Sequence, residues 1–194
     1  MVFSERRFFV NGYHLASKEW NGGAEYKVIA CHGWLDNAAS FDVLAPLLSD
    51  CHIIALDMPE HGLSDHKSAQ ASYNIWDDLL DILAVADEMG WEKFNLLGHS
   101  RGAIMSLLLT AAMPRRINAM VMLDAVLPQP IAIEDTAKQL HKFLVEQRRA
   151  AHKTLPSYAS IDEAVAARCK AAGMCEKSAR TIVERGLKKT ADKF

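Results

Sequence analysis

The strongest constraint on the fold of this chain is a G-x-S-x-G pattern at residues 98–102, which stands between two apolar stretches. The apolar run at 94–97 predicts a short buried strand, and the longer one at 103–113 predicts a helix. Ser100 therefore falls at a sharp turn, where the backbone is strained and the residues two before and two after it must lack side chains. The two glycines of the pattern meet that demand. The stretch predicts a nucleophile elbow, which holds the Ser100 hydroxyl clear of the backbone.

The alternative interpretation is a glycine-rich turn whose serine has no role. A bare G-x-S-x-G occurs by chance in roughly one chain in twenty of this size, so the pattern alone is weak. The strand expected before it and the helix expected after it favour the elbow.

Composition excludes several classes of protein. The chain has 194 residues, of which 50% are hydrophobic and 24% charged, as in a globular protein with a substantial core. A formal net charge of -2 gives no electrostatic reason to expect nucleic acid or an anionic membrane as a partner. The N-terminus has no signal-peptide pattern and no apolar run reaches about 18 residues, so we expect a cytoplasmic location. The four cysteines show no metal-ligand spacing, so we expect free thiols and neither a metal nor a cofactor.

The first two thirds of the chain predict a parallel sheet buried between helices. Asn11-Gly12, between two aromatic or β-branched runs, predicts an antiparallel hairpin. After it, strands and helices alternate at the spacing of parallel βαβ units. Besides the elbow strand, we expect buried strands at 26–31, 52–57 and 117–123, a short helix near 41–48, and an amphipathic helix at 74–89 with Trp76, Leu79, Leu80 and Leu83 on its apolar stripe.

The last third of the chain has a different composition. Beyond Pro128-Gln129-Pro130 the sequence is rich in helix-forming residues and contains no β-like run. We expect helices at 131–151, 161–172 and 176–188. The change predicts a division into a core at residues 1–126 and a helical region at residues 127–194.

Together these residues resemble a known family. A strand leads into His32-Gly33-Trp34, another into the D-M-P-E-H-G-L-S stretch at 57–64, and a third into the elbow, in the usual order of the α/β-hydrolase fold. The H-G-W-L-D-N stretch at 32–37, followed by Ser-Phe at 40–41, is similar to the serine hydrolase-like (kraken-type) branch. The resemblance implies a mostly parallel central sheet with helices on both faces, and a helical cap formed by residues 127–194.

The resemblance also implies an activity. It points to a serine hydrolase that acts on a small-molecule ester or other acyl substrate, with Ser100 as the nucleophile. The oxyanion formed on attack needs two preorganised donors, and losing one costs about 3 kcal/mol of transition-state stabilisation. In the family these would be the backbone N–H groups of Arg101 and Trp34. A serine at this position also excludes the haloalkane dehalogenase and epoxide hydrolase chemistries of similar proteins, which use a carboxylate there.

Three further residues support this expected site. Gly33 lets the loop that carries Trp34 pass close to the nucleophile. We expect His32 to brace that loop, in preference to a role in proton transfer. His99 precedes the nucleophile, and at a sharp turn adjacent residues point in different directions, so we expect it to form pocket wall and not to act as the base.

The acid and the base of a catalytic triad follow the serine in the chain order Ser, acid, His. Asp124 ends the strand after the elbow helix, and it is either that acid or a hydrogen-bonding residue at a strand end. The family continues after its cap with two more strands, and the catalytic histidine follows the last of them. Here only His141 and His152 follow Asp124, in or beside expected helices. We therefore expect the sequence to be part of a longer protein or a truncated product, with the catalytic histidine beyond residue 194.

Two classes of function stand at this point. The first is the serine hydrolase, completed by residues beyond 194. The second is a non-catalytic chain on the same scaffold, which binds a ligand or partner in the pocket or is a remnant. The oligomeric state does not follow from the sequence. The missing strands would leave 117–123 as a bare apolar edge, which soluble proteins avoid.

Overall fold

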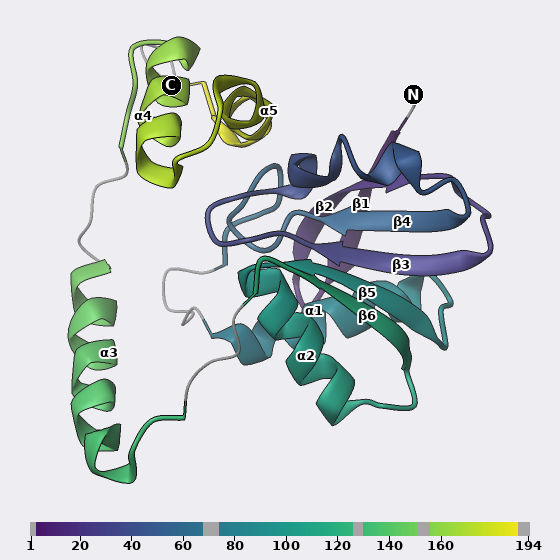
Figure 1. Ribbon diagram of the computed structural model, residues 1–194, viewed down its shortest axis with the longest axis horizontal. Helices are drawn as coiled ribbons and strands as arrows, with labels where there is room; N and C mark the ends of the chain where they lie inside the picture. Colours follow the sequence, from purple (N-terminus) through teal and green to yellow (C-terminus); the bar gives the residue numbers. More distant parts are fainter. Residues whose placement is uncertain (1–2, 68–73, 126–129, 151–155, 190–194) are drawn as a thin grey trace.

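The computed structural model describes residues 3–67, 74–125, 130–150 and 156–189. In that part of the chain, six strands form one sheet in the order β1-β2-β4-β3-β5-β6 (Figure 1). The pairs among β4, β3, β5 and β6 are parallel, while β1 and β2 join the sheet antiparallel. The strands are β1 (Ser4–Val10), β2 (Tyr13–Trp20), β3 (Tyr26–Cys31), β4 (Cys51–Leu56), β5 (Phe94–His99) and β6 (Ile117–Leu123). The predicted α/β-hydrolase arrangement of strands is confirmed.

The β1–β2 hairpin turns on Asn11-Gly12, as the sequence predicts. Val10 pairs with Tyr13, so the loop has two residues, and both have positive φ angles of 51° and 90°. That is the type I′ geometry whose twist matches the flanking strands, and asparagine followed by glycine tolerates it best.

Helices cover the sheet on both faces. α1 (Ile75–Glu88) and α2 (Arg101–Ala112) pack on one face, over Ile29, Ile54 and Leu96. The other face carries two short 3-10 helices, η1 (Ala38–Phe41) and η2 (Ala45–Leu47), over a cluster that includes Phe41 and Leu97. The single helix expected near 41–48 was therefore wrong. Pro46 lacks an N–H and occupies the first turn of η2, so a continuous α-helix through this segment would lose a hydrogen bond.

The buried face of α1 also differs from the prediction. Trp76 and Leu80, expected on the apolar stripe, are each 60% exposed. Asp78 and Asp81 are buried in their place, beside Leu79, Ile82, Val85 and Ala86. Two buried carboxylates are tolerated because each has partners: the Arg101 guanidinium contacts Asp78, and Tyr13 Oη donates to Asp81 at 2.6 Å. The positions of apolar residues alone could not predict which face of α1 is buried.

β6 lies at the edge of the described sheet. It pairs with β5 on one side, and its other side has no strand partner within the described residues. Val121 is 53% exposed, and Leu123 is exposed as well. The prediction of an apolar edge at 117–123 is confirmed for this part of the chain.

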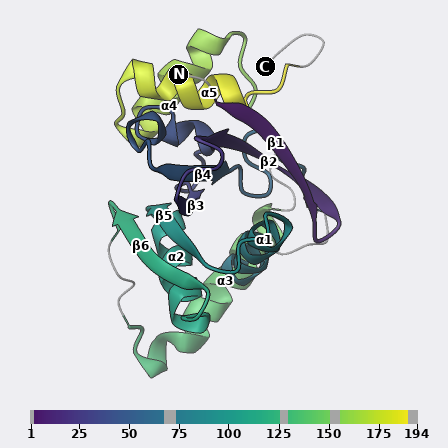
Figure 2. The ribbon, with the colours of Figure 1, turned by 90° about the vertical axis from the view of Figure 1, so that its right-hand side faces the viewer.

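The C-terminal helices form two unlike parts. α3 (Thr136–Ala150), which follows the short η3 (Ile133–Asp135), stands apart from the sheet in Figure 1, and Val145 is the one described side chain of α3 that is not exposed. α4 (Ile161–Ala172) and α5 (Glu176–Gly186) pack on each other and lie on the other side of the sheet from α1 and α2 (Figure 2). No helix in the described ranges is both long and apolar enough to cross a membrane.

Four polar contacts dock the α4–α5 pair on the core. The Arg168 guanidinium pairs with Asp36, and Asn37 Nδ2 donates to the Ile182 carbonyl at 2.8 Å. Arg185 bridges two carboxylates, with Nη2 2.9 Å from Asp57 and Nη1 2.7 Å from Glu5. Asp36, Asn37 and Asp57 all follow strands of the parallel sheet. The two helices are therefore attached at the carboxyl ends of the strands, where the elbow also lies.

Candidate active site

The elbow has the strained geometry that its sequence predicts. Ser100 lies between β5 and α2 with φ 50° and ψ −112°, a region that costs a side-chain-bearing residue about 1–3 kcal/mol. A Cβ on Gly98 would overlap the Gly102 carbonyl, and a Cβ on Gly102 would overlap the carbonyl of Cys31. The Ser100 N–H donates to the Leu123 carbonyl at 2.9 Å, which ties the turn to β6. Arg101 begins α2, so its N–H belongs to the first turn, where helix geometry provides no intrahelical acceptor.

The loop after β3, residues 32–37, lies against the elbow and is here called the β3 loop. A Cβ on Gly33 would come within 2.9 Å of His99 Nδ1, so a larger residue here would require the His99 side chain to move. The Asp36 N–H donates to the Gly33 carbonyl at 3.1 Å and closes a turn that has Trp34 and Leu35 at its centre. Leu35 has a positive φ of 61°, which is unusual for a bulky residue.

His32 braces this loop with both ring nitrogens. Nδ1 donates to the Gly33 carbonyl at 2.7 Å, and Nε2 accepts from the Met58 N–H at 3.0 Å. Burial, and next the neighbouring His61, lower the pKa of His32 from 6.5 to about 3. A neutral ring with both nitrogens occupied is suited to support and is poorly placed to take a proton from Ser100.

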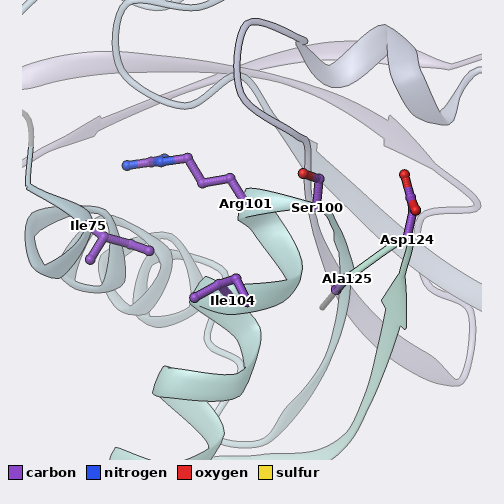
Figure 3. Close-up of a pocket in the computed structure, with 6 residues that line it drawn as sticks. All are labelled: Ile75, Ser100, Arg101, Ile104, Asp124 and Ala125. Atoms are coloured by element: carbon purple, nitrogen blue, oxygen red, sulfur yellow. The ribbon is translucent and has the colours of Figure 1, made fainter. Parts of the chain in front are cut away.

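The Arg101 side chain leads away from Ser100 towards α1 (Figure 3). Its guanidinium pairs with Asp78 of α1 and lies 5.5 Å from the centre of the Trp34 ring. Burial raises the pKa of Asp78, and the charge of Arg101 opposes that rise. The Arg101 side chain thus contacts both α1 and Trp34. Arg101 and Trp34 are the two residues whose N–H groups are the expected oxyanion donors.

Asp124 and His99 stand beside the nucleophile. Asp124 follows β6, has a positive φ of 47°, and its side chain is 93% exposed at the same edge of the sheet as Ser100 (Figure 3). His99 lies between two carboxylates, with Nε2 3.9 Å from Asp124 and Nδ1 3.5 Å from Asp36. Asp36 in turn pairs with Arg168 of α4. The C-terminal helices are therefore connected to the residues around the elbow.

A cavity of about 320 Å³ opens at the elbow. It combines polar and apolar groups, and Figure 3 shows them converging between α2, the start of α1 and the end of β6. Its lining consists of Ile75, Ser100, Arg101, Ile104, Asp124 and Ala125. Among the residues expected from sequence, Ser100, Arg101 and Asp124 meet in this cavity, whereas Trp34, His32, Gly33 and His99 lie in or against the β3 loop and not in the lining.

Sequence reasoning missed several residues of this site. Ile104 could have been found, because it follows Ser100 by four positions and so lies on the same face of the helix. Ile75 and Asp78 could not, because their approach depends on how α1 packs. His141 lies on α3, and His152 is outside the described residues. No group of three potential metal ligands occurs among the described residues, and all four cysteines are free.

These features define a class of protein, and comparison with known sequences agrees. The family described as alpha/beta hydrolase fold matches residues 26–160, and the chain belongs to it. Within that family it is similar to serine hydrolase-like proteins. The human serine hydrolase-like protein is 32% identical over 160 residues, which cover 82% of this chain and 76% of the relative. A probable serine hydrolase of Drosophila melanogaster is 33% identical over 186 residues, covering 91% of this chain and 55% of the relative.

A solved structure gives the same result. A hypothetical protein from Pseudomonas aeruginosa PAO1 is 40% identical and superposes with a TM-score of 0.92, covering 97% of this chain and 67% of that chain. The chain spans only part of its relatives: 33% of a serine hydrolase-like protein of Dictyostelium discoideum, about half of several others, and 76% of the human protein. The chain therefore has the fold of the hydrolase family over the part of these relatives that it spans.

Proposed function

We propose that this chain carries the nucleophile, the oxyanion donors and the acid of a serine hydrolase that acts on esters or related acyl compounds. The observation that supports this most strongly is the strained Ser100 at φ 50°, between two glycines that tolerate no Cβ and beside a cavity with a partly apolar lining. Strain of this kind is kept in a fold only where the surroundings enforce it, and it concentrates at functional sites.

In the proposed reaction, Ser100 Oγ attacks the acyl carbon while a histidine takes its proton. The carbonyl oxygen becomes an oxyanion, which accepts hydrogen bonds from the N–H groups of Arg101 and Trp34. The intermediate then collapses, the alcohol leaves with the proton from the histidine, and water releases the acyl group from Ser100 by the reverse sequence. Asp124 is proposed to orient that histidine, which we place beyond residue 194.

The cavity supports a small acyl substrate. Ile75, Ile104 and Ala125 provide an apolar lining beside Ser100, and about 320 Å³ is at the lower end of the volumes of small-molecule sites. The division into a core at residues 1–126 and a cap at residues 127–194 belongs to the same proposal. In it, α4 and α5 are the part of the cap that is docked on the core.

One observation favours the second candidate, a non-catalytic chain that binds a ligand in this cavity. Within the described residues the Ser100 hydroxyl has no hydrogen-bond partner, so no described histidine stands ready to take its proton. His99 faces Asp36 and Asp124 instead. The two candidates therefore differ in whether the protein turns over an ester.

Hydrolysis of a short-chain p-nitrophenyl ester by the full-length protein separates them. Ser100→Ala should abolish turnover, whereas Ser49→Ala, at an exposed serine away from the cavity, should leave it unchanged. Asp124→Asn should lower kcat by about 10⁴ if Asp124 orients the base, because the amide favours the wrong tautomer. A loss below about tenfold with the fold intact would assign that role to another carboxylate. Absence of turnover in the wild-type protein would favour the binding function.

A further inference from the structure

The turn at the centre of the β3 loop is closed by one hydrogen bond and strained at one residue. The Asp36 N–H donates to the Gly33 carbonyl at 3.1 Å, and of the two central residues Leu35 has a positive φ, 61°, while Trp34 does not. A positive φ at the third position alone is the pattern of a type II turn, which normally requires glycine or asparagine there. Leucine occupies it here, so the turn is held against a local cost of about 1–2 kcal/mol.

The competing conformation is a type I turn. It keeps the closing hydrogen bond between Gly33 and Asp36 but rotates the central Trp34–Leu35 peptide by roughly half a turn, which brings Leu35 to negative φ. Because the closing bond is common to both forms, it cannot select between them. The selection must come from groups that contact the central peptide.

His61 supplies such a contact. Its Nε2 accepts a hydrogen bond from the Leu35 N–H at 3.3 Å, and its Nδ1 donates to the Pro59 carbonyl at 2.9 Å. The second bond fixes the tautomer, since a ring that donates from Nδ1 and is neutral has a free lone pair on Nε2. Rotation of the central peptide would turn the Leu35 N–H away from this acceptor and bring the Trp34 carbonyl towards it.

The same imidazole packs against Trp34. The two rings meet edge to face with centroids 5.6 Å apart, and the His32 ring lies tilted against the His61 ring with centroids 5.0 Å apart. The Trp34 ring also lies over the Arg101 guanidinium at 5.5 Å. His61 and Arg101 therefore both contact the ring of Trp34, one of the two central residues of the turn.

We propose that His61 is a positioning residue, which holds the Gly33–Asp36 turn in its type II form, and the Trp34 N–H proposed for the oxyanion belongs to this same turn. The inference rests on the proposed function for the oxyanion role, but the selection of the turn is a property of the fold. A misplaced donor forfeits part of the stabilisation that one oxyanion donor provides, which is 10²–10³ in kcat when a donor is lost completely. Removing the His61 acceptor should therefore slow acylation of Ser100 by about tenfold or more.

A pair of variants isolates the acceptor. His61→Leu retains bulk but removes the acceptor, and His61→Gln offers a side-chain oxygen that can reach the Leu35 N–H. In the first variant, hydrogen exchange at Leu35 should rise by about tenfold or more, and labelling of Ser100 by a fluorophosphonate should slow by a similar factor. The second variant should restore both. Equal exchange at Leu35 in all three proteins, or faster exchange with unchanged labelling, would overturn the proposal.

The wild-type protein gives a check that needs no variant. The proton of His61 should reside on Nδ1 at neutral pH, visible in the pattern of two-bond and three-bond ¹⁵N–¹H correlations of the imidazole. A ring protonated on Nε2 could not accept from Leu35 and would overturn the proposal, even if His61→Leu failed to fold. If fluorophosphonate does not label the wild-type protein, the proposed function fails, while the exchange and tautomer measurements still decide the role of His61 in the turn.

Discussion

The imidazole of His32 lies beneath the β3 loop, and its neutrality is a condition of the fold. His32 is almost fully buried, and both nitrogens bond to backbone groups, one as donor and one as acceptor. Protonation would place a second donor opposite the Met58 N–H and an uncompensated charge in the interior. This is why its pKa falls to about 3.

This histidine should make the protein sensitive to acid. The folded pKa is below the unfolded value of 6.5, so between about pH 6.5 and 3 the unfolded chain binds a proton that the folded chain does not. The free energy of unfolding should therefore fall as pH is lowered through this window, by at most about 1.4 kcal/mol per pH unit from this group. Urea unfolding of wild type and His32→Gln at several pH values checks this. The stability difference between the two proteins should shrink towards acid, and a difference independent of pH would contradict the account.

At the residue scale, the sequence predicts those residues whose identity is required by the local backbone geometry. The glycines around Ser100 follow from the turn itself, and the structure shows that a Cβ at either would overlap backbone. The contacts of Asp36 and His61 could not be predicted in this way. Asp36 meets Arg168, which is 132 residues away in the chain, and His61 meets Leu35 across 26 residues. Such contacts exist only once β3, β4 and the C-terminal helices have assembled.

At the scale of elements, polar contacts attach the α4–α5 pair to the core, and the largest cluster of them surrounds Arg185. Burial opposes the charge of Arg185, but its hydrogen bonds to Glu5 and Asp57 outweigh this and raise the pKa of the guanidinium. Asp57 is fully buried and also accepts from the N–H groups of Ala38 and Leu63, at 2.7 and 2.8 Å. The carboxylate therefore fastens α5, η1 and the segment after β4 at one point.

Removing the cation should be costly. Arg185→Met leaves the Asp57 carboxylate buried without its counter-ion, which in comparable cases destabilises by about 3–5 kcal/mol. Thermal unfolding should show a large drop in Tm. The matched control is Arg180→Met on the same helix, because Arg180 is only partly buried and bridges two exposed carboxylates, Asp162 and Glu176. Equal melting temperatures for the two variants would show that the Arg185 cluster does not hold α5.

The elements also show where hydrophobic patterns succeed and fail. The inner parallel strands β3, β4 and β5 are correctly predicted because both of their faces are covered, and a continuous apolar run then identifies such a strand. The buried face of α1 is wrongly predicted because Asp78 and Asp81 are buried through partners on α2 and β2. A pattern that counts only apolar residues places such carboxylates in solvent. The predicted orientation of the helix then differs from the observed one by a rotation about the helix axis.

At the scale of the whole molecule, the edge of the sheet governs behaviour in solution. β6 presents unpaired backbone groups along one side within the described sheet, with Val121 and Leu123 exposed beside them. An apolar edge of this kind is a template for pairing with another chain. The 194-residue chain should therefore associate as its concentration rises.

Charge on this edge should suppress the association. Light scattering after size exclusion should give a mass above 21.5 kDa for the wild-type chain, and a smaller average mass for Val121→Lys. Val43→Lys adds the same charge at an exposed valine between η1 and η2, away from β6, and should not change the mass. A wild-type chain that remains monomeric at all concentrations would show that this edge is not a pairing surface.

The central claim is that the strained elbow makes Ser100 a nucleophile. The most direct measurement is to treat the full-length protein with a fluorophosphonate and to locate the adduct by mass spectrometry of its peptides. The account predicts one adduct, on Ser100, and none in Ser100→Ala. An adduct on another residue, or labelling of the same extent in Ser100→Ala, would contradict it.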